Sequence, residues 1–269
     1  MAGEHEASLE TTLDNAVRAL ANARRLLVIT GAGMSAESGL PTYRGVGGLY
    51  NHNETVEGLP IEQALSGPVF RSRPEVTWKY LIEIERHARG ATFHRGHQIL
   101  ADLESKFDAL WILTQNIDGF HTAAGSRDVV EIHGNLYRLS CCQCGRRWRV
   151  NDYAGLNVPP ACDACGGLVR PQVVLFEEML PSEALTRLES WLDTGYDAVM
   201  SIGTSSHFPY IIQPILSACR QGIPSIEINP APTALSEQVD FYLPLPAGQA
   251  LQALWDRWPD VTDDGESVA

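Results

Sequence analysis

The segment of residues 31–44, Gly-Ala-Gly-Met-Ser-Ala-Glu-Ser-Gly-Leu-Pro-Thr-Tyr-Arg, constrains the fold of this chain more than any other feature. It follows an apolar run, Leu26–Thr30, whose unbroken hydrophobic character is typical of a buried parallel strand. Gly31, Gly33 and Ala36 match the G-x-G-x-x-G/A pattern of a strand-to-helix turn, in which the backbone approaches a pyrophosphate. The sequence therefore predicts a nucleotide-binding turn at the end of this strand.

The residues after this turn depart from an ordinary dinucleotide-binding fold. Pro41 is predicted to end the helix, and Arg44 places a fixed cation just beyond the turn. An ordinary fold would continue with a second strand and a ribose-binding acidic residue about 20 residues further on. Residues 46–53 (Val-Gly-Gly-Leu-Tyr-Asn-His-Asn) are instead loop-like, so we expect the ribose contact to come from another part of the chain.

Apolar strand candidates recur along the chain and alternate with helical patterns. Residues 13–20, 185–192 and 251–258 carry apolar side chains at helical spacing. Such alternation predicts an α/β fold with a doubly wound parallel sheet. The predicted strands are Leu26–Thr30, Ala109–Thr114, Val129–Ile132, Val173–Phe176, Asp197–Gly203, Pro224–Asn229 and Phe241–Leu245.

Two segments interrupt this alternation and are predicted to form a smaller domain over the sheet. Residues 45–95 combine loop with helices, one of which begins at Pro74 and runs to about His87. Residues 138–171 are rich in Cys, Gly and Pro. We expect the rest of the chain to form a large domain and a polar tail, with bounds of 10–44, 96–137 and 172–260 for the domain and 261–269 for the tail.

Composition limits the partners of the chain. With 269 residues and 44% hydrophobic content, it can bury one sizeable core beside a smaller one. Its net charge of −13 argues against nucleic acid or an anionic membrane as the main partner, although an acidic surface could attract basic peptides. We see no export signal and no apolar run of about 20 residues, so we expect a cytoplasmic protein without a membrane span. The oligomeric state is left open.

Four cysteines form two C-x-x-C pairs separated by residues 145–161. The pairs are Cys141 with Cys144 and Cys162 with Cys165, and this spacing is typical of a four-cysteine zinc site. Redox dithiols or buried thiols are the alternative. Because four thiolates close the coordination sphere, we expect one structural zinc ion rather than a catalytic one.

Polar residues follow several predicted strands at the edge where open α/β sheets bind ligands. Gln115, Asn116 and Asp118 surround the apolar Ile117 directly after one strand, in a pattern suited to a ribose and a carboxamide. A capping turn before a helix is the alternative interpretation. His133 closes another predicted strand and is our candidate general base, ranked above His94, His97 and His121 because none of these closes a strand.

A second turn of small residues, Gly203-Thr204-Ser205, follows a later strand, and Asn229 closes the next one. Each could be plain turn chemistry. Together they offer the ribose contact that is missing after the first turn.

In this order, the motifs resemble those of the sirtuin family of NAD-dependent protein deacylases, over residues 20–250. The resemblance rests on residues 31–44, 115–118 and 133–134, the four cysteines, residues 203–205 and Asn229. It implies one catalytic domain over residues 10–269, with a Rossmann-like large domain and a small domain made of a zinc ribbon and a helical insertion. It also implies that NAD and an acyl-lysine protein or peptide meet in the cleft between them, yielding nicotinamide, O-acyl-ADP-ribose and free lysine.

The resemblance also assigns roles to individual positions. His133 would be the base, and Asn116 and Asp118 would build the nicotinamide pocket. Val173, Val174 and Phe176 would pair with the substrate peptide as an added strand. The NAD-lining residues would be Gly31, Ala32, Gly33, Glu37, Tyr43, Arg44, Gln115, Asn116, Ile117, Asp118, Gly203, Thr204, Ser205, Asn229 and Ala247.

Some positions depart from the family pattern. Glu177 stands where a glycine usually follows the substrate-strand phenylalanine, and Pro209 comes one residue early, so the loops that grip the peptide are expected to differ. Sirtuins that prefer succinyl groups carry a Tyr-x-x-Arg pair where this chain has Leu81 and Ile84. Apolar side chains there favour acetyl or longer uncharged acyl groups, unless the helix is displaced by one residue or Arg86 or Arg89 reaches in.

Two other functions stay open at this point. One is NAD hydrolysis or ADP-ribosyl transfer, which needs the same NAD pocket but no acyl channel. The other is a non-catalytic NAD-binding module stabilised by zinc, which would not need the candidate base His133.

Overall fold

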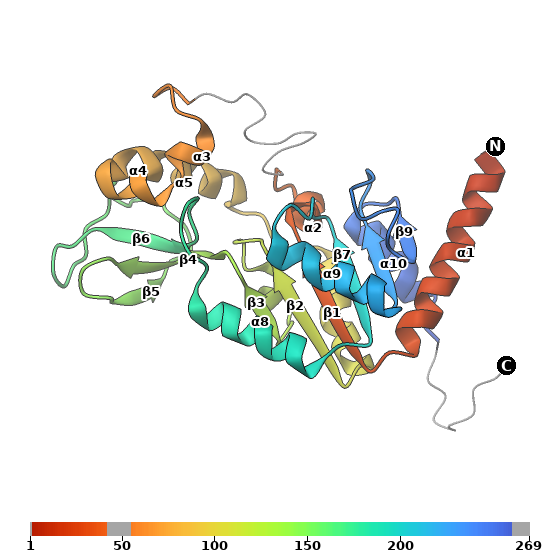
Figure 1. The fold of residues 1–269 in the computed structure, drawn as a ribbon. Coiled ribbons are helices and arrows are strands. Elements are labelled where there is room, and N and C mark those ends of the chain that lie inside the picture. The colour runs from red at the N-terminus through yellow and green to blue at the C-terminus, as the bar shows by residue number, and fades with distance from the viewer. Residues whose placement is uncertain (1, 42–54, 260–269) are drawn as a thin grey trace.

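The computed structural model describes residues 2–41 and 55–259 and contains two sheets. The large sheet has six parallel strands in the order β3-β2-β1-β7-β8-β9 (Figure 1), which is the order of a doubly wound Rossmann-like sheet. This arrangement confirms the predicted fold class. The strands are β1 (Arg25–Thr30), β2 (Ala109–Thr114), β3 (Val129–Glu131), β7 (Ala198–Ile202), β8 (Ser225–Ile228) and β9 (Phe241–Leu243).

Helices cover both faces of the large sheet because its strands are apolar on both sides. Alternate residues of β1 show the division: Leu26 and Val28 face one hydrophobic cluster, whereas Leu27 and Ile29 face another. The first cluster packs under α1 (Ala2–Ala21), α6 (Arg95–Leu103) and α10 (Ala247–Asp256). The second packs under α8 (Ser182–Thr194) and α9 (Pro209–Gln221).

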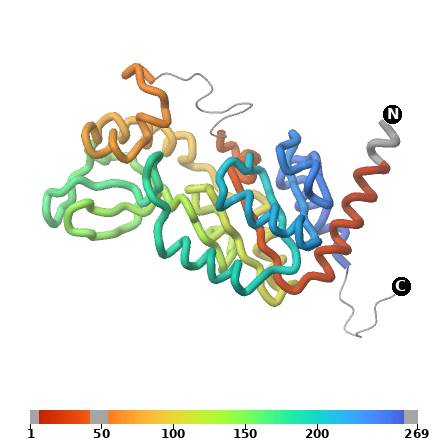
Figure 2. Tube along the Cα trace, in the orientation of Figure 1, coloured from red at the N-terminus to blue at the C-terminus, as the bar shows by residue number. Residues whose placement is uncertain are grey.

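A smaller antiparallel sheet lies at the opposite end of the molecule from α1 (Figure 2). Its strand order is β5-β4-β6, with β4 at Gly134–Cys141, β5 at Arg147–Arg149 and β6 at Val169–Val173. Three helices pack against it: α3 (Ile61–Ala64), α4 (Gly67–Ser72) and α5 (Pro74–Ala88). The fully buried Trp78 of α5 joins the two layers, because its indole nitrogen donates to the Val169 carbonyl at 3.0 Å.

We propose that this separate core marks the small domain expected from the two insertions. Side chains from residues 61–88 and 136–175 share one hydrophobic cluster. Three members of this cluster, Leu136, Val173 and Leu175, lie within the ranges predicted for the large domain.

The predicted strand over residues 173–176 is wrong in its bounds and in its sheet. β6 runs from Val169 to Val173, antiparallel to β4. Val174 still donates to the carbonyl of the residue opposite it, His133, at 2.9 Å. The pairing then stops, because the Leu175 amide donates to the Glu178 carboxylate instead, at 3.0 Å. Phe176 then forms only an isolated bridge with Ser66.

The helix expected after the first turn is shorter than the sequence suggested. It consists of α2 (Ala32–Ser35) and the 3-10 turn η1 (Ala36–Ser38). Gly39 ends it in the left-handed conformation, at φ 83°, two residues before Pro41. Glycine, not proline, therefore terminates this helix.

The remaining short elements are η2 (Glu104–Lys106), before β2, and α7 (Phe120–Ala123), between β2 and β3. None of the helices that the structure describes is both long enough and apolar enough to cross a membrane.

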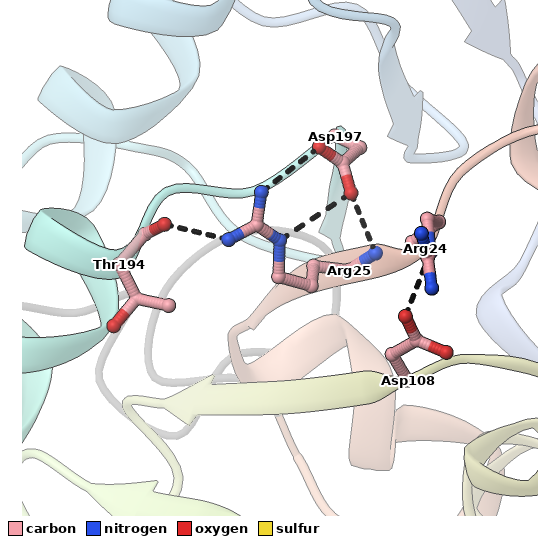
Figure 3. A network of polar contacts seen from close by, with 5 residues as sticks. All are labelled: Arg24, Arg25, Asp108, Thr194 and Asp197. Atoms are coloured by element: carbon pink, nitrogen blue, oxygen red, sulfur yellow. Dashed lines mark hydrogen bonds and ion pairs between the residues drawn. The ribbon is translucent and has the colours of Figure 1, made fainter.

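Ion pairs fasten the strands at their amino ends, away from the polar turns (Figure 3). Arg25 donates from its backbone amide and its guanidinium to the Asp197 carboxylate, at 2.9–3.4 Å, and also to the Thr194 carbonyl at 2.7 Å. Arg24 pairs with Asp108 at 2.8 Å. These contacts join β1 to the segments that lead into β7 and β2.

Candidate active site and metal centre

Two glycine turns meet where β1 and β7 end. The Gly31 amide donates to the Ile202 carbonyl at 3.0 Å, and the Gly33 amide donates to the Gly203 carbonyl at 2.9 Å. A Cβ added to Gly33 would lie 2.7 Å from the Gly203 Cα atom, closer than atoms can pack. The glycines of the first motif are thus required for the contact between the two turns, and the Gly33 amide is already engaged there.

Thr204 joins three strand ends into one polar cluster. Its hydroxyl accepts from the Gln115 side chain at 2.8 Å and from the Ser206 amide at 3.1 Å. Its carbonyl accepts from the Asn229 side chain at 3.2 Å. Because these residues follow β2, β7 and β8, and the Gly203 turn also contacts the turn after β1, the predicted nucleotide residues converge at one edge of the sheet.

Asn116 and Asp118 lie in the same network, together with a residue that the sequence analysis did not select. The Asn116 side chain donates to the Gly31 carbonyl at 3.0 Å and to the Ser35 hydroxyl at 3.1 Å. Ser35 in turn donates to Asp118 at 2.7 Å. Burial raises the pKa of Asp118 above its ordinary value. The sequence feature that could have pointed to Ser35 is its position in the first helical turn after the glycine motif.

The geometry around His133 fixes the position of its proton. The Gln115 carbonyl lies 3.1 Å from Nδ1, and a carbonyl can only accept, so Nδ1 carries the hydrogen. Burial lowers the pKa of His133, which keeps the ring neutral and leaves the lone pair on Nε2. Nε2 lies 2.7 Å from the Tyr210 hydroxyl of α9. His133 lies two residues beyond β3, whose last residue is Glu131.

The glycine after His133 has a specific structural role. Gly134 adopts φ +83°, and a Cβ there would lie 1.9 Å from the Gln172 carbonyl oxygen of β6. No other residue fits this position, at which the chain leaves the large sheet and begins β4.

The three rival histidines lie close together inside the large domain. His97 and His121 are almost fully buried, and burial lowers the pKa of His97 to about 2 and that of His121 to about 3. His121 contacts the Thr30 hydroxyl at 3.0 Å, and His94 contacts the Met34 carbonyl at 2.7 Å. Burial therefore keeps the His97 and His121 rings neutral, whereas His94 is partly buried at the start of α6.

Other residues selected from the sequence lie around this cluster. The Glu37 carboxylate accepts from the Gly248 amide at 2.5 Å, which ties η1 to the start of α10 beside the buried Ala247. Ile117 packs against the small-domain cluster, whereas Ser205 is exposed. Tyr43, Arg44 and the tail at 261–269 lie outside the described residues. The NAD-contact roles of all these positions stay predictions.

The predicted substrate-binding residues lie between the two sheets or in the small-domain core. Val174 hydrogen-bonds to the residue that carries the candidate base, and Phe176 is 36% exposed. Glu177 adopts φ +63°, so it keeps the left-handed conformation that a glycine would favour. Leu81 is buried in the small-domain cluster and Ile84 packs against it. Their role in an acyl pocket stays a prediction.

The four predicted metal ligands come together in the small domain. All four Sγ atoms of Cys141, Cys144, Cys162 and Cys165 lie within 4.8 Å of one another. Two Sγ–Sγ distances are 3.5 and 3.8 Å. A tetrahedral zinc ion with Zn–S bonds of about 2.3 Å places its sulfurs about 3.8 Å apart, so the residues fit this metal.

Comparison with known proteins agrees with these observations. The model of the Sir2 family matches residues 31–209. The NAD-dependent protein deacylase 2 of Pseudomonas syringae pv. tomato is 49% identical over 242 residues, which cover 89% of this chain and 97% of that protein. The protein of the same name from Pseudomonas aeruginosa is 49% identical over 240 residues, covering 88% and 92%.

Solved structures show the same fold. A complex of a Sir2 homologue with NAD has a TM-score of 0.79 and 34% identity, covering 90% of this chain and 92% of that one. A complex of Sir2 with a p53 peptide and NAD+ has a TM-score of 0.75 and 29% identity, covering 89% and 95%. Because the family model and these relatives span most of the chain, the resemblance of its motifs is confirmed, and the chain belongs to the Sir2 family, the sirtuins.

Proposed function

We propose that this chain is an NAD-dependent protein deacylase that removes acyl groups from lysine side chains. The relatives at 49% identity carry the name NAD-dependent protein deacylase. The observation that carries the proposal is His133, a neutral histidine with its proton fixed on Nδ1, beside the polar cluster around Thr204, Asn116 and Asp118.

The described residues fit an NAD molecule at this cluster. Asn116, Asp118 and Gln115 supply amide and carboxyl groups at the strand ends, and Ser205 and Asn229 follow the next two strands for the adenosine end. When bound, NAD would supply a ribose carbon at which an acyl-lysine oxygen can replace nicotinamide, with nicotinamide as the leaving group. Ser35 holds Asn116 and Asp118 in place through two hydrogen bonds. The zinc ion has a structural role, because four sulfurs leave no open position.

The part of His133 in the reaction follows from its proton positions. Nε2 is the only ring atom that can accept a proton, because Nδ1–H is donated to Gln115. When Nε2 takes a proton, the Gln115 carbonyl stabilises the resulting cation. A positioned base of this kind contributes about 10²–10⁴-fold to the rate.

The peptide contacts and the acyl preference are the finer part of the proposal. We place the substrate peptide along residues 173–176, next to the base, since Val174 is hydrogen-bonded to His133. Apolar Leu81 and Ile84 support acetyl or longer uncharged acyl groups over succinyl groups. The cytoplasmic location stays a prediction of the sequence.

The test is nicotinamide release with and without acylated peptide. The wild type should release nicotinamide only with an acyl-lysine peptide; release that is independent of peptide would indicate an NAD hydrolase instead. His133→Ala should bind NAD normally by calorimetry yet lose at least about 100-fold in turnover. His207→Ala, at an exposed histidine two residues after Ser205, is the control and should retain full turnover. A peptide series bearing acetyl, succinyl and long-chain acyl groups tests the acyl preference.

A further inference from the structure

The proposed base is covered by a tyrosine of the same chain. The Tyr210 hydroxyl lies 2.7 Å from Nε2 of His133. Since Nδ1 already donates to the Gln115 carbonyl, Nε2 of the neutral ring is an acceptor and the Tyr210 hydroxyl is the donor. Burial raises the pKa of Tyr210 to about 12, so its hydroxyl keeps its hydrogen at neutral pH. The atom that must accept a proton is therefore occupied by another hydrogen bond.

Aromatic packing holds this tyrosine in place. Tyr210 stacks on Phe208, with ring centroids 5.4 Å apart and an angle of 12° between the planes. Both rings also meet the His133 ring edge to face, at 5.7 Å for Phe208 and 6.0 Å for Tyr210. Phe208 is 41% exposed, so this aromatic pair separates the base from solvent.

The tyrosine also has space to move away from the base. It lines a surface cavity of about 470 Å³ between α8 and α9, together with Leu188, Tyr196 and Pro214. A rotated Tyr210 ring could thus remain in apolar surroundings without contacting His133. An imidazole nitrogen has a single lone pair, so a substrate hydroxyl and the Tyr210 hydroxyl cannot both donate to Nε2 at full strength.

We propose that Tyr210 is a positioning residue that acts as a latch on His133. In the substrate-free protein its hydroxyl covers Nε2 and fixes the ring, and a substrate hydroxyl must displace it toward the cavity. The proton of that hydroxyl then passes to Nε2, giving an imidazolium whose Nδ1–H still donates to Gln115. This inference rests on the proposed function, because it takes His133 as the base.

The first test measures the latch without any reaction. The ¹⁵N shifts of the His133 ring, assigned by comparison with His133→Asn, give its tautomer and its pKa. Tyr210→Phe keeps the stacked ring and removes the donor to neutral Nε2, so the pKa of His133 should rise by about half a unit to one unit. Within residues 2–41 and 55–259, the groups found in contact with this ring are the Gln115 carbonyl, Phe208 and Tyr210, and none of these three is charged at neutral pH.

A matched control is available in the same cavity. Tyr196 is buried, and its hydroxyl donates to the Pro214 carbonyl at 2.6 Å, without contacting His133. Tyr196→Phe should therefore leave the pKa of His133 unchanged. An unchanged pKa in Tyr210→Phe, or an equal rise in both variants, would overturn the latch. Because these titrations need neither NAD nor peptide, they decide the contact even if the wild type turns over no acylated peptide.

Steady-state kinetics supply the second test. Without the latch, substrate no longer has to break the Tyr210 bond, so the KM for NAD should fall about three- to tenfold with kcat not reduced. The acid limb of the kcat/KM profile should move to higher pH, because more of the base is protonated at a given pH. A kcat loss of about 100-fold would instead make Tyr210 a proton relay and would overturn the proposal.

Discussion

Thr204 offers the most direct test of how the site is assembled. Its side chain is 4% exposed, and its hydroxyl accepts from the Gln115 side chain and the Ser206 amide. Thr204→Val keeps the branched shape and removes that acceptor. The buried Ser206 amide then loses its partner at a cost of about 1–3 kcal/mol, whereas the partly exposed Gln115 can turn to water at a cost of about 0.5 kcal/mol.

We therefore expect Thr204→Val to lower the free energy of unfolding by about 2–3 kcal/mol, roughly a 30- to 150-fold change in the folded-to-unfolded ratio. Urea denaturation followed by tryptophan fluorescence measures this change, and calorimetry should show weaker NAD binding, because Gln115 is no longer held. Thr204→Ser is the matched control: it keeps the hydroxyl and should lose about 1 kcal/mol through the missing methyl group. If the valine variant is as stable as the wild type, or more stable than the serine variant, the hydroxyl does not organise the strand ends.

Three further predictions concern other parts of the molecule. Cys141→Ser, or chelation, should remove about one zinc ion per chain by metal analysis and unfold the small domain, seen as lost circular dichroism; full activity and an unchanged melting temperature in metal-free protein would contradict this. Glu177→Gly should raise the free energy of unfolding by about 0.5–1 kcal/mol, because glycine adopts φ +63° without strain; a lower melting temperature would count against it. Burial raises the pKa of Asp197, but the hydrogen bonds from Arg25 outweigh it and leave the pKa lowered. The pair therefore stabilises the fold above the unfolded-state pKa of about 3.9, and this stabilisation disappears as pH falls through the lower folded-state value. Asp197→Asn should lower the free energy of unfolding by about 1 kcal/mol or less at pH 7. Urea denaturation should show that the difference from the wild type shrinks below about pH 4.

The large sheet could be predicted from sequence because its strands are buried on both faces. Each predicted strand of that sheet is present, with bounds shifted by at most two residues, as for Phe241–Leu243 against the predicted 241–245. The strand over residues 173–176 failed because an apolar run shows burial and not pairing. Val173 and Leu175 are buried in the small-domain cluster, whereas the Phe176 amide donates to the Leu65 carbonyl of another segment at 3.0 Å.

The site was predictable as a set of segments but not as a network. The zinc ligands follow from spacing alone, and the polar residues after each strand follow from the topology of the sheet. Ser35 and Tyr210 were missed because each acts through a partner far away in the chain, 83 residues for Ser35 with Asp118 and 77 for Tyr210 with His133. The position of Ser35 in the first helical turn places it near the glycine motif, but turn and helix signals do not show which distant residue a side chain contacts.

Strand β4 connects the proposed base to the proposed zinc site. The strand begins at Gly134, directly after the proposed base, and ends at Cys141, a proposed zinc ligand. Both neighbouring strands pair with it, although the register of its pairing with β6 shifts between Asn135 and Leu139, so one strand about 25 Å long connects the two sites. We therefore expect that oxidation of the thiolates at one end shifts the histidine at the other end. Peroxide should then lower the activity without reacting in the cleft.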